Sequence, residues 1–373
     1  MIYKKFQDLN LSALGFGMMR LPLCEGTEII DEAKTAEMVD FAIKNGVNYF
    51  DTAWGYLNGN SEIVTGKVLS AYPRDSYYLA SKFPGFDVSN MSRVEEIFEK
   101  QLEKCGVEYF DFYLFHNVTE NNIDGYLDPA FGIYDYLMKQ KANGRIRHLG
   151  FSTHGTLDTM RRFLQAYGKD MEFCQIQLNY LDWEFQDAKT KIELLKEYNI
   201  PVWVMEPLRG GKLASLPEVH TASLQALRPE EKTPAWAFRF LQTIPEVTMI
   251  LSGMSTFEQT KSNVETFAED KPLNEKEMQT ILEIGHSLVN GIPCTACRYC
   301  TEKCPQELDI PELIKVYNEH TFIGSKTIPE DALHAFETGK RPSDCLGCQS
   351  CEAVCPQNIK ISEFMETFAG KIQ

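Results

Sequence analysis

Eight cysteines near the end of the chain repeat one spacing twice. The first run reads Cys294-x-x-Cys297-x-x-Cys300-x-x-x-Cys304-Pro305, and the second reads Cys345-x-x-Cys348-x-x-Cys351-x-x-x-Cys355-Pro356. Three thiolates at this interval wrap one face of a [4Fe-4S] cluster, whereas the fourth, which precedes proline, ligates the other cluster of the pair. The spacing therefore predicts two clusters, one held by Cys294, Cys297, Cys300 and Cys355 and the other by Cys345, Cys348, Cys351 and Cys304.

This run is the one found in bacterial ferredoxins, and it fits iron and sulfide better than zinc or disulfides. Zinc sites usually take two separated pairs of ligands, and disulfides need an oxidising compartment, to which nothing in the chain points. The other three cysteines, Cys24, Cys105 and Cys174, have no metal-ligand spacing among themselves. We expect them to be buried as small hydrophobic side chains.

Length and charge limit what the chain can do. Its 373 residues, of which 43% are hydrophobic, can bury a large core and are enough for two units. We expect a larger unit over residues 1–285 and a cluster-binding unit over residues 286–373. With 53 acidic against 37 basic residues the net charge is -16, which disfavours nucleic acid as a partner because such binding needs cations to neutralise phosphates.

The beginning of the chain, residues 1–10, carries Lys4 and Lys5 but no apolar stretch of the kind that a secretory signal contains. No apolar run approaches the length needed to span a bilayer. We therefore expect a cytoplasmic protein without membrane association.

Short apolar runs rich in β-branched and aromatic residues alternate with helix-length amphipathic segments, which predicts repeated βα units and a parallel sheet. Eight runs are candidate strands, over residues 13–19, 47–53, 77–83, 110–116, 146–153, 173–180, 201–208 and 247–254. Helices are expected between them, for example over 31–45, 92–105, 156–167 and 187–197. Eight such units favour a closed (β/α)8 TIM barrel in the α/β class, followed by a small C-terminal α-helical, ferredoxin-like iron-sulfur domain.

The segments after the fourth and seventh candidate strands, 118–134 and 210–233, are unusually long. In a barrel both would overhang the C-terminal face, where active sites lie. They are candidate substrate walls, and tolerated surface insertions are the alternative.

Four polar residues fall at the C-terminal ends of three consecutive candidate strands: Asp51, Tyr56, Lys82 and His116. Each alone has an ordinary structural explanation, such as capping a turn or packing. The C-terminal ends of barrel strands converge on one face, so residues far apart in the sequence can share a pocket there. Together the four form a candidate catalytic constellation.

Here the chain resembles the aldo-keto reductase family. The resemblance is carried by segments 48–56 (NYFDTAWGY), 81–82 (SK) and 112–116 (FYLFH), together with 14–17 (LGFG) and 150–152 (GFS). These motifs recur in family order over roughly residues 1–270. The resemblance implies a barrel oxidoreductase that reduces a small carbonyl compound or oxidises an alcohol.

The resemblance assigns Tyr56 as the proton donor to a carbonyl whose carbon receives a hydride, with Asp51, Lys82 and His116 as its support. Elementary chemistry agrees with these roles. A tyrosine with a pKa near 10 is a weak acid at neutral pH, and an adjacent Lys82 ammonium would stabilise the phenolate and lower that pKa. Asp51 would keep Lys82 charged, and His116 would orient the carbonyl and stabilise the developing oxyanion.

The resemblance also implies a nicotinamide cofactor, NADPH or NADH. The family's ring-stacking tyrosine is replaced by Met205, which can equally be a core side chain, and Thr153 stands where the family usually has asparagine. The basic clamp for a 2′-phosphate is missing from residues 251–259, so the choice between the two nucleotides stays open. The implied contacts are Ser152, Gln175, Asn179 and Met205 around the nicotinamide, Arg209 and Gly211 near the pyrophosphate, and Gln259 and Asn263 near the adenine.

The chemistry expected in the barrel and the chemistry expected at the clusters transfer different numbers of electrons. A nicotinamide donates two electrons as a hydride, whereas each cluster transfers one electron at a time. A flavin would split the pair, but no flavin motif is visible. Three hypotheses follow. The clusters link carbonyl chemistry to a ferredoxin- or flavodoxin-like carrier, or they are a structural clamp or oxygen sensor beside ordinary nicotinamide-dependent reduction. In the third, the chain is a redox-responsive regulatory or binding protein on a reductase scaffold.

Overall fold

The computed structural model describes residues 1–288, 291–292, 294, 298–323 and 339–372. The chain divides into two compact units, Met1–Ile281 and Leu282–Gln373, and each is described by itself. The boundary expected from the sequence, between residues 285 and 286, falls within α12 (Glu275–Leu288), the helix in which the first unit ends and the second begins.

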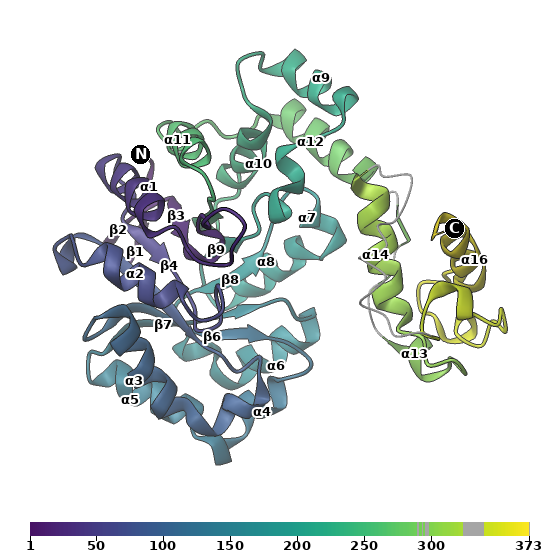
Figure 1. Ribbon diagram of the computed structural model, residues 1–373, viewed down its shortest axis with the longest axis horizontal. Helices are drawn as coiled ribbons and strands as arrows, with labels where there is room; N and C mark the ends of the chain where they lie inside the picture. Colours follow the sequence, from purple (N-terminus) through teal and green to yellow (C-terminus); the bar gives the residue numbers. More distant parts are fainter. Residues whose placement is uncertain (289–290, 293, 295–297, 324–338, 373) are drawn as a thin grey trace. The chain divides into compact units, whose positions relative to one another are not determined.

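The first unit is a closed barrel of eight parallel strands with helices around it (Figure 1). Neighbouring strands follow the order of the chain, and the last strand pairs with the first. The predicted (β/α)8 architecture is therefore confirmed. Its strands are β3 (Leu14–Gly17), β4 (Tyr49–Asp51), β5 (Tyr78–Phe83), β6 (Phe110–Val118), β7 (Ile146–Thr153), β8 (Cys174–Gln177), β9 (Val202–Met205) and β10 (Val247–Gly253).

Helices connect successive strands and form the outer layer. They are α1 (Glu32–Lys44), α2 (Ser61–Leu69), α3 (Val94–Cys105), α5 (Ile133–Ala142), α6 (Leu157–Tyr167), α8 (Ala188–Glu197), α10 (Thr233–Gln242) and α11 (Phe257–Thr266). Local sequence sets their ends, since the Asp31 side chain accepts a hydrogen bond from Lys34 N at the start of α1 and Gly106 ends α3 in the left-handed conformation. Within the described ranges, no helix is both long and apolar enough to cross a membrane.

A hairpin not predicted from the sequence closes the N-terminal end of the barrel. Strands β1 (Tyr3–Phe6) and β2 (Leu9–Ser12) pair antiparallel around a turn in which Gln7 has a φ of 53°. Because this turn contains no glycine, it lacks the usual hairpin signal. Phe6 packs edge-on against Trp203, with ring centroids 5.0 Å apart, in a core that also holds Tyr49 and Phe112. This apolar plug leaves the C-terminal end of the barrel for chemistry.

The two long segments follow β6 and β9, as expected. The first folds into α4 (Ile123–Leu127) and a 3-10 turn, η4 (Pro129–Phe131), and its buried Tyr126 donates a hydrogen bond to His116 O at 2.7 Å. The second contains η6 (Arg209–Ala214) and α9 (Glu218–Leu227). Both segments are therefore largely helical rather than open loops.

The second unit has its own apolar core. Its helical elements are α13 (Tyr299–Glu302), α14 (Ile310–Ile323), η7 (Pro342–Asp344), η8 (Glu352–Val354) and α16 (Ile361–Ile372). Two of the cysteines predicted to bind clusters, Cys300 and Cys351, are buried in this core. Its other members are Leu308, Ile310, Leu313, Ile314, Ile359, Ile361, Phe364, Met365 and Phe368.

The repeat in cysteine spacing is accompanied by a repeat in backbone conformation. Arg298 and Gln349, each one residue past the second cysteine of its run, have left-handed φ values of 64° and 59°. Glu307 and Asn358, each three residues past the fourth cysteine, have φ values of 50° and 52°. Left-handed residues other than glycine are uncommon. The two runs therefore share a left-handed backbone conformation at these matching positions, and each leads into a helix, α14 or α16.

Close packing of α2 on α3 yields a stability test at Gly66. Alanine normally stabilises a helix interior by about 1 kcal/mol relative to glycine. At Gly66, however, an added Cβ would meet the backbone of Cys105. We expect Gly66→Ala to lower the free energy of unfolding of the barrel by about 1–3 kcal/mol, measured by urea unfolding followed by circular dichroism.

The matched control is Gly370→Ala in α16, where an added Cβ has no neighbouring atom within 4 Å. This variant should be at least as stable as the parent chain. Equal unfolding midpoints for Gly66→Ala and the parent would contradict the close approach of the two helices.

Candidate active site and cluster cavities

The four candidate catalytic residues converge at the C-terminal end of the barrel. Asp51 ends β4, Tyr56 lies in the turn that follows, and Lys82 and His116 belong to β5 and β6. Lys82 Nζ donates to Asp51 Oδ1 at 2.5 Å and to the Thr52 carbonyl oxygen at 2.8 Å. It lies 3.3 Å from the Tyr56 hydroxyl oxygen. Lys82 is fully buried, so these oxygens replace water around its ammonium group.

Lys82 and Tyr56 hold protonation states suited to proton donation. Burial lowers the pKa of Lys82, but the Asp51 carboxylate and the Tyr56 oxygen outweigh burial and raise that pKa above its usual value. Burial raises the pKa of Tyr56 and outweighs the opposing influence of Lys82. Lys82 thus lowers the Tyr56 pKa as the sequence predicts, but burial, which the sequence analysis did not include, makes the net shift upward. At neutral pH the lysine is charged and the tyrosine keeps its proton, as a general acid requires.

His116 completes this wall of the site as a neutral ring. Burial, together with the positive charge of Lys82, holds the pKa of His116 well below its usual value. The ring stands edge-on to Tyr56 and to Phe86, with centroid distances of 5.9 and 5.2 Å. Among the described residues, His116 Nδ1 has no hydrogen-bond partner. A neutral imidazole carries one N–H donor, which can be offered to a carbonyl oxygen.

A buried polar network behind Lys82 was not predicted from the sequence. The carboxylate of Glu62, which is fully buried in α2, accepts hydrogen bonds at 2.7 Å from Ser81 Oγ, Gln101 Nε2 and Lys104 Nζ. Gln101 Nε2 also donates to the backbone oxygen of Lys82 at 3.0 Å. The network thus fixes the strand segment that carries the lysine.

The same network reaches the turn that carries Tyr56. Lys104 Nζ lies 4.6 Å from the centre of the Trp54 ring, two residues before the tyrosine. The sequence gives no signal for the network, because Ser61 and Glu62 at the start of α2 are polar and only the structure shows that both are fully buried. Buried carboxylates are rarely left without partners.

A cavity of about 500 Å³ opens beside Asp51 and Tyr56. Gln175 is buried in its wall, and among the described residues Gln175 Oε1 has no hydrogen-bond partner. A buried acceptor without a donor is costly, and the carboxamide N–H of a nicotinamide would satisfy it. The residues present therefore fit a nicotinamide dinucleotide. Of the eight residues implied for such a cofactor, five line the cavity: Gln175, Met205, Gly211, Gln259 and Asn263.

The other three implied residues are not among those lining the cavity. Ser152 Oγ accepts a hydrogen bond from Asn117 N at 2.8 Å, next to His116. Both ends of the Asn179 amide serve the surrounding protein, since its Nδ2 donates to Asp182 and its Oδ1 accepts from backbone N–H groups. Arg209 Nε donates to Asp182 at 3.3 Å. These residues hold strand ends and loops in place around the cavity.

An ion pair across the cavity wall was also missed. Arg20, in η1 (Met18–Arg20), lies 3.6 Å from the carboxylate of Glu206, which follows β9. Both residues line the cavity. Glu206 has a left-handed φ of 56°, and Arg20 O accepts a hydrogen bond from Ser255 Oγ at 2.8 Å. Pairs between distant strand ends leave no local pattern from which they could be predicted.

In the second unit the cysteines predicted to bind clusters line two separate small cavities. Cys304, Cys345, Cys348 and Cys351 line one of them. Cys294, Cys300 and Cys355 line the other, and Cys297 lies outside the described residues. This is the same division of thiols that the spacing predicts. The apolar core packs against cysteines of both sets, whereas Cys348 is exposed. Thiols gathered around a cavity are the donors that an iron-sulfur cluster takes, so the residues present fit such a group.

Two further observations concern possible metal-ion sites and the state of the cysteines. Within the described part of the chain, no group of three or more His, Cys, Asp or Glu side chains is arranged to hold a metal ion. No disulfide bond joins any two of the described cysteines. Cys105 and Cys174 are buried, as expected, whereas Cys24 is only partly buried.

Comparisons with known proteins agree with this fold. Residues 13–286 match the Aldo/keto reductase family, and residues 293–359 match the 4Fe-4S dicluster domain. L-galactose dehydrogenase of Arabidopsis thaliana is 28% identical over 298 residues, covering 74% of this chain and 90% of that protein. NADH-specific methylglyoxal reductase of Escherichia coli is 25% identical over 226 residues, covering 55% and 66%. A solved aldo-keto reductase of Bacillus halodurans in its holo form matches with a TM-score of 0.62 and 25% identity, covering 76% and 96%.

The barrel and the family match together define an oxidoreductase with a (β/α)8 fold. The chain belongs to the aldo-keto reductase family, and its C-terminal region matches the 4Fe-4S dicluster domain. The family recognised from the sequence motifs is thereby confirmed.

Breaking the buried ion pair should cost stability in a characteristic way. Lys82→Met leaves the Asp51 carboxylate buried without a counter-charge, which should lower the free energy of unfolding by about 3–5 kcal/mol. The double variant Asp51→Asn with Lys82→Met removes both charges and should recover part of that loss. Urea unfolding of the two variants measures the difference. A double variant less stable than Lys82→Met would contradict the assigned pairing.

Proposed function

We propose that this protein reduces a small-molecule carbonyl compound to an alcohol, or catalyses the reverse reaction, with a nicotinamide cofactor bound in the barrel cavity. One observation carries the proposal. The buried ammonium of Lys82 contacts both Asp51 and the Tyr56 hydroxyl at the wall of that cavity. A protonated hydroxyl beside a fixed cation is the arrangement that carbonyl reduction requires.

The bound cofactor would supply a hydride to the carbonyl carbon, and the chain supplies the rest. Gln175 and Met205 would bind the nicotinamide end, because both line the cavity beside Tyr56. Tyr56 would donate its hydroxyl proton to the carbonyl oxygen as negative charge develops there. The neutral ring of His116 would orient that oxygen with its N–H donor. In the reverse direction Tyr56 would accept the proton of the alcohol.

The electrostatics of the site favour proton transfer from Tyr56 over loss of its proton to solvent. When Tyr56 gives up its proton, the phenolate is left next to the charged Lys82, whose interaction with it strengthens at that moment. Asp51 is already hydrogen-bonded to Lys82 before reaction, so no large rearrangement is needed. Preorganised charge of this kind usually supplies the largest share of transition-state stabilisation.

The names of two relatives support a small carbonyl or hydroxyl compound as substrate. One is named a dehydrogenase of L-galactose and the other an NADH-specific reductase of methylglyoxal. Both compounds are small and polar. We therefore propose short aldehydes, ketones and sugars as the first compounds to assay.

We further propose that the second unit holds two [4Fe-4S] clusters and exchanges single electrons with a ferredoxin- or flavodoxin-like carrier. Its support is the division of cysteines between two cavities and the match to the dicluster domain. Two clusters together store two electrons, the number that one hydride carries. Cluster ligation would follow the sequence assignment, with Cys297 completing the set of Cys294, Cys300 and Cys355.

Tyr56→Phe tests the proposed chemistry directly. The variant keeps the ring but lacks the proton that completes reduction, so kcat for aldehyde reduction should fall by about 100- to 10,000-fold. Steady-state assays under anaerobic conditions with either nicotinamide nucleotide measure this loss. The iron and sulfide content of the variant should equal that of the parent, since Tyr56 belongs to the first unit.

The matched control is Tyr72→Phe, which removes a hydroxyl that bonds Asp40 at the barrel surface. This variant should keep the parent's turnover. Full activity in Tyr56→Phe would remove the tyrosine from the mechanism. Loss of activity in both variants would show that the assay reports folding rather than chemistry.

A further inference from the structure

The turn after β4 that carries Tyr56 has an unfavourable backbone conformation. The three residues directly after the tyrosine have left-handed φ values: 51° at Leu57, 57° at Asn58 and 81° at Gly59. Left-handed residues other than glycine are uncommon, and bulky ones are rarer still. Such conformations persist only where the surrounding structure holds them. The position of the Tyr56 hydroxyl therefore depends on contacts between this turn and the rest of the barrel.

Lys104, near the end of α3, supplies one such contact. Its Nζ lies 4.6 Å from the centre of the Trp54 ring, two residues before the tyrosine. A Cβ added to Gly59, three residues after the tyrosine, would lie 3.7 Å from the same nitrogen. A cation above an aromatic ring is attracted to it, more strongly away from water, and the Lys104 side chain is only 12% exposed. The ammonium group thus lies against the turn on both sides of Tyr56.

Glu62 fixes where that ammonium group can lie. Its carboxylate is fully buried, and its Oε2 accepts a hydrogen bond from Lys104 Nζ at 2.7 Å. Its other oxygen, Oε1, accepts hydrogen bonds from Ser81 Oγ and Gln101 Nε2, both at 2.7 Å. Ser81 directly precedes Lys82 in β5. One carboxylate therefore connects, through separate oxygens, the strand of the active-site lysine and the lysine that contacts the turn.

Helix α3 links the same two segments a second time. Gln101 and Lys104 are three residues apart, so they lie on one face of the helix. Gln101 Nε2 donates to the backbone oxygen of Lys82 at 3.0 Å, while Lys104 contacts the turn. These anchors set the separation between Lys82 Nζ and the Tyr56 hydroxyl oxygen, which is 3.3 Å. That distance already exceeds the usual hydrogen-bond length of about 2.9 Å, so a small displacement of the turn would separate the two groups.

We propose that Glu62 and Lys104 are positioning residues for the reduction, which hold the turn so that the Tyr56 hydroxyl stays in contact with Lys82. Neither is among the residues that line the cavity, so we expect both to act through the turn rather than on the bound molecules. Misplacement of reacting groups by about 1 Å can lower a rate about 100-fold. The proposal rests on the proposed function, because it concerns the proton donor of that reaction.

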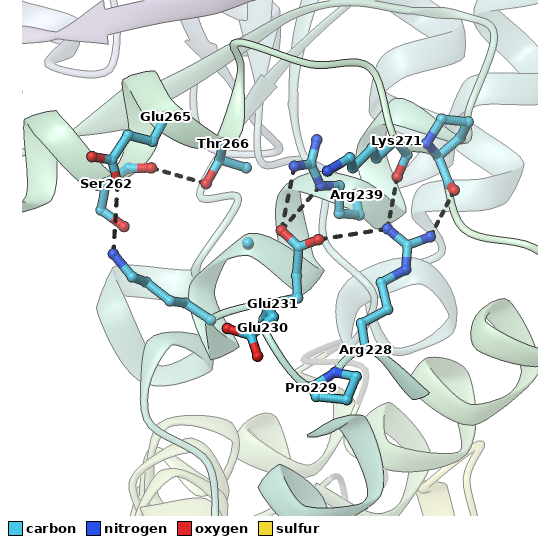
Figure 2. A pocket seen from close by; sticks show the side chains of 12 residues that line it. Arg228, Pro229, Glu230, Glu231, Arg239, Ser262, Glu265, Thr266 and Lys271 are labelled. Carbon is cyan, nitrogen blue, oxygen red and sulfur yellow. Dashed lines mark hydrogen bonds and ion pairs between the residues drawn. The ribbon is translucent and has the colours of Figure 1, made fainter. Parts of the chain in front are cut away.

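A second cluster of ion pairs, elsewhere in the outer layer, offers a control. Figure 2 shows Glu231 between Arg228 and Arg239, with ion-pair distances of 3.7 and 3.3 Å. The Glu231 side chain is 14% exposed, close to the value for Lys104. Arg228 also pairs with Glu277 of α12 at 2.6 Å, and Arg239 lies in α10. This cluster therefore links α10 to α12, whereas the Glu62–Lys104 pair links α2 and α3 to the turn.

Lys104→Met tests the proposal in the full chain, with steady-state reduction of a small aldehyde under anaerobic conditions. We expect kcat to fall about 10- to 100-fold because the turn loses its contact. The dissociation constants for NADH and NADPH, measured by calorimetry, should change by less than about twofold, because the cavity lining is intact. The matched control Lys100→Met removes a half-exposed lysine one turn earlier on α3 and should leave kcat unchanged.

Two further variants separate positioning from stability. Lys104→Met leaves the buried Glu62 carboxylate without its counter-charge, so it should also lower the urea midpoint. The double variant Glu62→Gln with Lys104→Met removes both charges and should recover part of that midpoint, while kcat stays low because the contact with Trp54 is still missing. Glu231→Gln breaks the other cluster and should lower the urea midpoint without lowering kcat.

Three results would overturn the proposal. The parent's kcat in Lys104→Met would remove the lysine from any role in turnover. Recovery of kcat together with stability in the double variant, or an equal loss of kcat in Glu231→Gln, would reduce the pair to a structural role. A parent protein that reduces no aldehyde with either nucleotide would overturn the proposed function itself, and this proposal with it.

Discussion

The buried ammonium of Lys82 imposes the constraint that the rest of the active site satisfies. A lysine without access to water costs several kcal/mol unless oxygens replace its hydration. Here Asp51, the Thr52 carbonyl and the Tyr56 hydroxyl surround Nζ, and all three belong to β4 and the turn that follows it. Stabilising the charge therefore also fixes the proton donor. The hydrogen bonds that stabilise the buried Lys82 ammonium group therefore also hold the Tyr56 hydroxyl in position.

The fold serves this arrangement at both ends of the barrel. Aromatic side chains and the β1–β2 hairpin plug the N-terminal end, which leaves the strand ends of the opposite face to converge around Lys82. The Glu62 network then anchors β5 and the turn that carries Tyr56 from behind. The Glu62 network is buried and hydrogen-bonded, so the segment that carries Tyr56 rests on an ordered polar support.

Features with short-range signals could be predicted from the sequence. Alternation of apolar runs and helical segments located all eight strands, and the cysteine spacing anticipated how the thiols divide between two cavities. Features that depend on three-dimensional surroundings could not be predicted. The Gln7 turn has no glycine, the Arg20–Glu206 pair joins distant segments, and burial reverses the expected shift in the Tyr56 pKa. Asn179 shows that position in a motif alone does not establish a cofactor contact, because its amide forms hydrogen bonds with the neighbouring loop.

The central claim is that hydride passes directly from nicotinamide to a carbonyl beside Tyr56, with the proposed clusters outside that step. The most direct test follows an isotope label. The purified protein would reduce a small aldehyde with NADH carrying deuterium at the transferred position of C4, and mass spectrometry would locate the deuterium in the alcohol. Direct transfer predicts one deuterium on the carbinol carbon of every product molecule. An alcohol without deuterium would contradict the account, because the electrons would then have reached the carbonyl by another route.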